Sequence, residues 1–249
     1  MSALPLVLLH GWGLTPSVWR GLREALPSRA VTLAPALPGH GNALPAPSAD
    51  LAAWSDALLP ALPDRAALCG WSLGGLIALD LARRHPERVA RLILIGSTPR
   101  FVARSDDGPW PHGLDAATVA AFNANFATDP AGTQKKFVAL QSLGDARRRA
   151  VAGELAAALA DTGPERAPSL SSGLEVLANT DLRAFIPEIR QPAQLIHGAS
   201  DALMPLAAAE WLAQQLPDAR LAIFDDCGHA PFLSRPDECA ALIAGSLDD

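Results

Sequence analysis

The 249-residue chain is predicted to form an α/β fold with a mostly parallel central sheet, helices on both faces and an inserted helical segment. Short apolar runs alternate with helix-like segments through the first hundred residues, which is typical of parallel strands joined by crossover helices. From about residue 101 to residue 187, strand-like runs nearly disappear, and apolar residues recur at helical spacing, as at Val151, Leu155 and Leu159. Hydrophobic residues make up 49% of the chain, enough to bury a full core in one α/β domain.

Each expected strand is a short apolar run that ends within two residues of a Gly, Pro or Asp, where the chain can turn. Strands are expected at residues 6–9, 31–33, 66–69, 89–95, 194–197 and 220–224. Helices are expected near residues 18–26 and 51–62, at 76–84, and near 236–247. We therefore expect a core built from residues 1–100 and 188–249. Residues 101–187 enter between two strands of this core, so they should lie above the strand ends as a helical cap.

Composition and charge exclude several classes of function. The net charge of −6 disfavours a general nucleic-acid binder, which needs a broad basic face. The three cysteines, Cys69, Cys227 and Cys239, lack the spacing of metal ligands, so reduced thiols and no metal site are expected. The first apolar run has no basic segment before it and ends at His10, which fits neither a signal peptide nor a membrane span. A cytoplasmic monomer that needs no cofactor is the expectation.

The pentapeptide at residues 70–74 reads Gly-Trp-Ser-Leu-Gly and lies between an expected strand and an expected helix. A GxSxG sequence in this setting is typical of a nucleophile elbow, a sharp turn that exposes the hydroxyl of its central serine. Glycines suit both ends of such a turn because strand and helix pack too closely there for side chains. The alternative is a serine that only caps the helix. We predict that Ser72 is a nucleophile.

A serine hydroxyl needs a general base within reach and a third group that orients the base. Asp201 ends a small-residue turn after the expected strand at residues 194–197, and His229 follows the expected strand at 220–224. The carboxyl ends of parallel strands meet at one edge of a sheet, where functional loops gather. We therefore predict that Asp201 is the acid and His229 the base of a catalytic triad with Ser72.

Three other residues compete for these roles. Asp225 and Asp226 lie in the same loop as His229, where either could cap the loop or face solvent instead of serving as the triad acid. His197 lies inside an apolar strand, so a buried structural histidine is the favoured interpretation of this residue. Asp201 stays the predicted acid because it follows a different strand from the base.

Attack by Ser72 on a carbonyl creates an oxyanion that needs preorganised donors, each lowering the barrier by about 3 kcal/mol. Leu73, the residue after the nucleophile, supplies one backbone N–H. The second is expected from Trp12 in the glycine-flanked loop after the first strand, with His10 bracing that loop. The Trp12 ring either forms a wall for an acyl chain or only fills space. The loop is not a dinucleotide-binding fingerprint, because Pro16 stands where the third glycine is needed.

Four segments resemble the α/β-hydrolase superfamily across nearly the whole chain: HGWG at 10–13, GWSLGG at 70–75, GASD at 198–201 and CGHAPF at 227–232. Within it, HGWG, GWSLGG and the stretch at 137–141 resemble the pimeloyl-[acyl-carrier protein] methyl ester esterase family of biotin synthesis. This resemblance implies the same triad, in the chain order Ser, Asp, His. It also implies substrate contacts at Trp12, Ser72, Leu73, Phe137, Val138, Ala139, Leu140, Gln141 and His229.

Basic residues gather in the expected cap. Between residues 129 and 150, two acids, Asp129 and Asp145, stand against the basic residues Lys135, Lys136, Arg147, Arg148 and Arg149. The segment has a surplus of positive charge in a chain of net charge −6. Such a surface beside a cleft would attract and orient an acidic partner, as the acyl carrier protein implied by the resemblance would be. An ordinary solvated helix face is the alternative.

The sequence as a whole predicts a serine carboxylesterase. The resemblance implies that it hydrolyses the methyl ester of pimeloyl-acyl carrier protein to pimeloyl-acyl carrier protein and methanol, through an acyl-enzyme on Ser72. One alternative is a small-molecule carboxylesterase or lactonase of the same fold without a carrier-protein partner. A second is a non-catalytic binding protein that uses the cleft as a receptor pocket, for which a broken triad would be expected.

Overall fold

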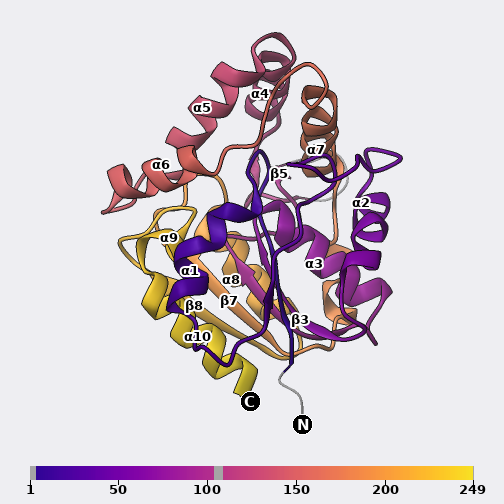
Figure 1. Cartoon of the computed structure of the whole chain (residues 1–249), viewed down its shortest axis with the longest axis vertical. Helices are drawn as coiled ribbons and strands as arrows, with labels where there is room; N and C mark the ends of the chain where they lie inside the picture. Colours follow the sequence, from indigo (N-terminus) through magenta and orange to yellow (C-terminus); the bar gives the residue numbers. More distant parts are fainter. Residues whose placement is uncertain (1–3, 104–108, 249) are drawn as a thin grey trace.

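A computed structural model describes residues 4–103 and 109–248; residues 1–3 and 249 of the expected core and 104–108 of the expected cap lie outside the described residues. The central sheet has the strand order β2-β1-β3-β4-β7-β8, and every pairing within it is parallel, as predicted (Figure 1). Its strands are β1 (Leu6–Leu9), β2 (Thr32–Leu33), β3 (Ala66–Trp71), β4 (Val89–Ile95), β7 (Ala193–Gly198) and β8 (Ala219–Phe224).

Side chains along the inner strands alternate between two apolar layers. In β1, Leu6 and Leu8 belong to one layer, and Val7 and Leu9 belong to the other. All four are fully buried, because helices cover both faces of the sheet. This two-sided burial is the reason that β1 reads as an unbroken apolar run rather than as an alternating one.

Three helices cover each face of the sheet, as expected for the fold class (Figure 1). On one face lie α1 (Arg20–Ala25), α9 (Pro231–Ser234) and α10 (Pro236–Asp248), and on the other lie α2 (Leu51–Leu58), α3 (Leu73–Arg84) and α8 (Leu206–Gln215). Short 3-10 helices span Pro16–Trp19, Leu59–Ala61 and Arg183–Glu188. Among the described residues, no helix combines the length and the apolar character that crossing a membrane requires.

Four further helices lie at one end of the molecule, at the top of Figure 1. They are α4 (Ala116–Thr128), α5 (Pro130–Gln141), α6 (Arg148–Ala157) and α7 (Ala167–Asn179). Asp115 and Asp129 cap α4 and α5, because their carboxylates accept hydrogen bonds from the backbone N–H groups of Thr118 and Gly132. The same part of the chain includes a two-stranded pair, β5 (Val102–Ala103) and β6 (Leu114–Asp115), whose strands are too short to leave a pattern in the sequence.

The structure also differs from the expected elements within the core. α3 begins at Leu73, directly after the serine, where the apolar pattern indicated a start at residue 76. β2 has only two residues at the edge of the sheet, and Val31 before it is exposed. α8 was not expected, because its alanine-rich sequence gives little contrast between an apolar and a polar face.

Candidate active site

The turn between β3 and α3 holds Ser72 in a strained conformation, with φ 56° and ψ −119°. It is the one non-glycine residue with positive φ in the described part of the chain. Close packing explains the glycines of the motif, since a Cβ atom on Gly70 would lie 2.3 Å from the Gly74 carbonyl oxygen. A Cβ atom on Gly74 would lie 2.1 Å from the carbonyl oxygen of Leu9 in β1. The segment therefore has the geometry of a nucleophile elbow.

Asp201 and His229 lie in the loops after β7 and β8, and their side chains meet there. The His229 Nδ1–H donates to Asp201 Oδ2 at 2.7 Å, and both side chains are almost completely buried. The other carboxylate oxygen accepts from the backbone N–H groups of Leu203 at 2.8 Å and Met204 at 2.9 Å. With both oxygens occupied, the carboxylate has a fixed orientation, which fixes the tautomer and plane of the imidazole.

Burial alone would raise the pKa of Asp201. Attraction to His229 and the hydrogen bond from its ring outweigh burial, so the pKa of this carboxyl lies below its usual value. Asp201 is therefore ionised at neutral pH, as an orienting acid must be.

The His229 loop lies directly beside the elbow. The indole Nε1–H of Trp71, the residue before the serine, donates to the His229 carbonyl oxygen at 2.9 Å. The centroids of the two rings are 5.4 Å apart. At the end of β4, a Cβ atom added to Gly96 would lie 3.1 Å from His229 Nδ1. The structure thus brings the predicted base, acid and nucleophile to one edge of the sheet.

The competing residues lie elsewhere or have other partners. Asp226 forms an ion pair with Arg235, and Asp225 is exposed. His197 is buried, and its Nε2–H donates to the Met204 carbonyl oxygen at 2.7 Å. Burial lowers the pKa of this histidine, which makes it a neutral structural residue next to the Asp201 loop.

Two buried histidines fix the loop at residues 10–13. His10 donates from Nδ1 to the Gly11 carbonyl oxygen at 2.8 Å and accepts from the Leu37 N–H at Nε2 at 3.0 Å. His40 accepts from the Gly13 N–H at 3.0 Å and donates from Nδ1 to the Pro38 carbonyl oxygen at 3.0 Å. Each ring uses one nitrogen as donor and the other as acceptor, so both are neutral. The loop passes the serine closely, since a Cβ atom on Gly11 would lie 3.4 Å from Ser72 Cβ.

Because His10 and His40 are buried and neutral, we expect the fold to lose stability in mild acid. Burial lowers the pKa of His10 to about 3, aided by the nearby His40, and burial lowers the pKa of His40 to about 4. The unfolded chain titrates near pH 6.5, so below that pH it binds protons that the folded chain does not bind. We expect the free energy of unfolding to fall between about pH 6.5 and pH 4, by about 1 kcal/mol per pH unit for each histidine.

Urea unfolding at pH 7, 6 and 5 measures this dependence. His40→Gln, whose side-chain carbonyl can still accept from the Gly13 N–H, should show a shallower pH dependence than the wild type. An equal slope in both proteins would contradict the role given to His40.

The Trp12 side chain joins this loop to the helices above the sheet. Its indole Nε1–H donates to the Leu170 carbonyl oxygen of α7 at 2.7 Å. Its ring packs edge-on against Phe122 and Phe126 of α4 and Phe137 of α5, with centroids 5.8, 5.2 and 5.2 Å away. The buried ring therefore packs the loop at residues 10–13 against α4 and α5.

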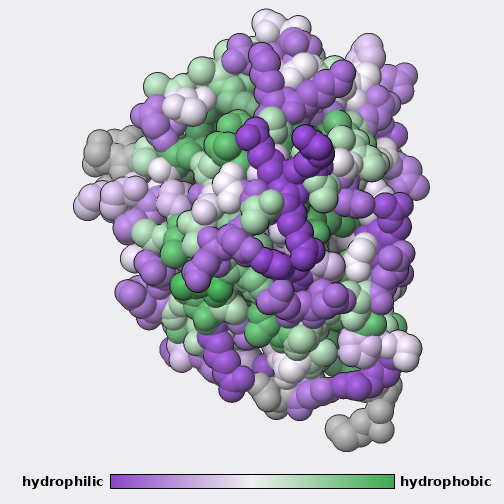
Figure 2. Space-filling model, turned by 90° about the vertical axis from the view of Figure 1, so that its left-hand side faces the viewer, coloured by the Kyte–Doolittle hydropathy of each residue, from purple (hydrophilic) through white to green (hydrophobic). Residues whose placement is uncertain are grey.

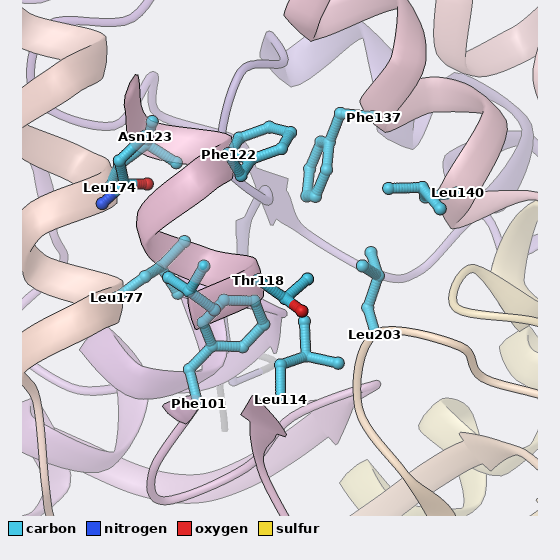
Figure 3. A pocket seen from close by; sticks show the side chains of 11 residues that line it. Phe101, Leu114, Thr118, Phe122, Asn123, Phe137, Leu140, Leu174, Leu177 and Leu203 are labelled. Carbon is cyan, nitrogen blue, oxygen red and sulfur yellow. The ribbon is translucent and has the colours of Figure 1, made fainter. Parts of the chain in front are cut away.

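An apolar cavity of about 60 Å³ lies between α4, α5, α7 and the loop after β7 (Figure 3). Phe122 and Phe137 lie side by side on the α4 and α5 side, and Leu203, two residues after Asp201, faces them from the loop (Figure 3). Leu140, at the edge of this cavity, is 40% exposed.

The side chains of residues 137–141, which were predicted to contact substrate, lie in different environments. Phe137 and Leu140 line the apolar cavity. Val138 packs into the apolar layer that also holds α1 and α10, and Ala139 is exposed. The Gln141 side chain is buried with its Nε2 unpaired, and the backbone carbonyl oxygen of Gln141 accepts from the His229 N–H at 3.3 Å.

Four of the five basic residues of the predicted carrier-protein surface have exposed side chains: Lys135, Lys136, Arg148 and Arg149. Arg147 is also exposed, but its guanidinium donates to the Ser234 carbonyl oxygen at 2.9 Å, which gives it a structural contact. The face that carries α5 and α6 presents strongly hydrophilic side chains with apolar surface between them (Figure 2). Asp145, one of the two acids of this segment, is buried and does not oppose the surface charge.

Three residues support the site in ways that were not expected from the sequence. His40 is flanked by glycines after a strand, a pattern that could have marked it as a loop brace. Gln134 donates from Nε2 to the Gly13 carbonyl oxygen at 2.6 Å, and Asp145 accepts from the Gly228 N–H at 3.1 Å. These two contacts join segments far apart in the sequence, so no local sequence pattern indicates them. Within the described residues, no cluster of three or more His, Cys, Asp or Glu could hold a metal ion.

Comparison with known proteins shows the family to which the chain belongs. A family model described as the alpha/beta hydrolase fold matches residues 5–236. The pimeloyl-[acyl-carrier protein] methyl ester esterase of Aromatoleum aromaticum is 63% identical over 98% of both chains. The biotin biosynthesis bifunctional protein BioHC of Teredinibacter turnerae is 37% identical over 97% of this chain and 44% of that protein. Among solved structures, the enol-lactonase of Burkholderia xenovorans shares the fold, with a TM-score of 0.84, 22% identity and coverage of 100% and 93%. The chain therefore belongs to the alpha/beta hydrolase fold family and, within it, to the family of pimeloyl-[acyl-carrier protein] methyl ester esterases.

Proposed function

We propose that this protein is a serine carboxylesterase that hydrolyses the methyl ester of pimeloyl-acyl carrier protein in biotin synthesis. The observation that carries the proposal is the 2.7 Å contact between Asp201 and His229 beside a strained serine elbow, in a chain 63% identical to a relative of that name. A buried acid, an oriented imidazole and an elbow serine are the parts that acyl transfer requires. A non-catalytic binding protein would have no need of them.

The first half of the reaction forms an acyl-enzyme. Ser72 Oγ attacks the methyl ester carbonyl while His229 Nε2 takes the hydroxyl proton, and Asp201 stabilises the imidazolium that results. The oxyanion of the tetrahedral intermediate accepts hydrogen bonds from the backbone N–H groups of Trp12 and Leu73. Leu73 begins α3, so the positive end of the helix dipole adds to this stabilisation. Collapse breaks the bond to the methoxy oxygen, and methanol leaves with the proton from His229.

The second half releases the acid. Water gives a proton to His229 and attacks the acyl carbonyl, and the same two N–H groups hold the new oxyanion. The bond to Ser72 Oγ then breaks, and the serine recovers its proton from His229. The products are the free carboxyl group of pimeloyl-acyl carrier protein and the enzyme in its starting state.

The helices at residues 101–187 act as a cap over this site in our proposal. The apolar cavity beneath them suits the methylene groups of an acyl chain, because its lining offers almost no polar atoms. Leu140 lines the cavity, and the backbone carbonyl oxygen of the next residue, Gln141, accepts from the His229 N–H, so this stretch of α5 links the cavity to the predicted base. An acyl carrier protein, which is acidic, would dock on the exposed basic side chains of α5 and α6.

Charge reversal on the cap tests the carrier-protein part of the proposal. Arg148→Glu with Arg149→Glu should raise KM for the carrier-bound ester about tenfold and leave KM for p-nitrophenyl butyrate within twofold, because only the carrier protein meets this surface. The increase should shrink at high salt, since these charges are exposed. Arg147 is kept in place because its contact with Ser234 is structural.

Steady-state kinetics on both substrates decide the outcome. The matched control is Arg65→Glu with Arg190→Glu, which changes the net charge equally on exposed residues that precede β3 and β7, at the opposite end of the sheet. Equal effects of the cap variant on both substrates would favour a small-molecule carboxylesterase or lactonase without a carrier partner.

A further inference from the structure

The turn between α5 and α6 is hydrogen-bonded to the loop that carries the base. The Ala146 N–H donates to the Asp226 carbonyl oxygen at 2.8 Å, and the His229 N–H donates to the Gln141 carbonyl oxygen at 3.3 Å. The turn also touches the acid loop, since a Cβ atom on Gly144 would lie 2.6 Å from the Ser200 carbonyl oxygen. One short segment of the cap thus contacts both loops of the predicted acid–base pair.

The Asp145 side chain is at the centre of these contacts and is 6% exposed. Its Oδ2 accepts from the Gly228 N–H at 3.1 Å. Its Oδ1 accepts from the Ser234 hydroxyl at 2.8 Å and from the Arg147 N–H at 2.7 Å. The Arg147 guanidinium donates to the Ser234 carbonyl oxygen, which closes a ring of hydrogen bonds between the turn and α9, and Asp145 joins the base loop to this ring through Gly228. A buried carboxylate is costly to desolvate, so it is retained only where several donors satisfy it.

We propose that Asp145 is a positioning residue for the reaction. It fixes the backbone at Gly228, the residue directly before His229, and thereby holds the imidazole in line between Asp201 and Ser72. A base displaced by a fraction of an ångström loses much of its catalytic effect, because proton transfer requires hydrogen-bond geometry. The inference rests on the proposed esterase reaction but not on the identity of the substrate.

Asp145→Asn tests the role, because it preserves the size of the side chain and removes one acceptor. Whichever way the amide turns, its NH2 group faces a backbone N–H group that the carboxylate had satisfied, that of Gly228 on one side or that of Arg147 on the other. We expect kcat for p-nitrophenyl butyrate to fall at least tenfold while KM stays within twofold. The low-field proton NMR signal of the His229 Nδ1–H should shift or broaden, which a loss of stability alone would not produce in folded protein.

Ser234→Ala is the matched control. It removes one donor to Asp145 and leaves the bond from Gly228 in place, so kcat should stay within threefold of the wild type even if Tm falls as much as in Asp145→Asn. A wild-type kcat and an unchanged NMR signal in folded Asp145→Asn would overturn the proposal and leave Asp145 a purely structural residue. If Asp145→Asn does not fold, Asp145→Glu decides, because it keeps the charge but displaces the acceptors: a fall in kcat supports the role and a wild-type kcat overturns it.

The small ester separates this proposal from the proposed function. A wild-type enzyme that hydrolyses p-nitrophenyl butyrate but not the carrier-bound ester would refute the substrate, and the Asp145 result would still stand. Full activity of Ser72→Ala would refute the serine esterase itself, whatever Asp145 does.

Discussion

Ser72→Ala is expected to reduce kcat for ester hydrolysis by about 10⁶-fold, because loss of the nucleophile in a serine triad removes the covalent route entirely. Alanine keeps the Cβ atom, so the strained turn at φ 56° and its packing should persist. The measurement is hydrolysis of p-nitrophenyl butyrate at high enzyme concentration. Mass spectrometry should also show the acyl adduct on Ser72 in the wild type and its absence in the variant.

Ser200→Ala provides the control for this result. Ser200 is exposed beside Asp201, so its replacement should leave kcat within twofold of the wild type. Activity of Ser72→Ala within tenfold of the wild type, with normal folding by circular dichroism, would end the serine-hydrolase proposal.

Asp201→Asn is expected to reduce kcat by about 10⁴-fold, the loss typical of a triad whose acid becomes an amide. The reason lies in the contacts of the carboxylate. Its Oδ1 satisfies two backbone N–H groups, at Leu203 and Met204, so the carbonyl oxygen of an asparagine would take that side. The NH2 group would then face His229 Nδ1 and force this nitrogen to act as acceptor. Nε2 would carry the proton and could no longer accept one from Ser72.

The pair Asp201→Asn and Asp226→Asn identifies the acid. Asp226 lies in the base loop and forms an ion pair with Arg235, so its replacement should change kcat less than threefold. The reverse order of effects, measured as kcat on the same ester, would assign the acid to Asp226 and contradict the geometry at Asp201.

Local patterns were sufficient for the sheet and for the candidate triad. Ser72, Asp201 and His229 each follow a strand that reads as an apolar run, and parallel strands present such residues at one edge. The parallel α/β fold predicted from the alternation is confirmed. The catalytic roles of the three residues stay predictions, but the structure makes the Asp201–His229 contact that they require.

The unexpected features depend on contacts between distant segments. His40 lies 27 residues from Gly13 in the sequence, and Asp145 lies 83 residues from Gly228, yet each pair is hydrogen-bonded. The surroundings of Val138, in a core layer rather than in the cavity, likewise depend on how α5 packs against α6. Packing of this kind leaves no periodic signal in the chain.

The amino-acid sequence by itself determined the alternation of strands and helices that makes the parallel sheet, the elbow around Ser72 and the chemistry of the residues at the strand ends. These follow from short-range properties: apolar periodicity, glycines at tight turns and the direction of parallel strands. Only the tertiary structure decided which histidines stay neutral, which acid meets the base and how the cap turn holds the base loop. Those outcomes depend on burial and on hydrogen bonds across the fold, which exist only once distant segments have packed together.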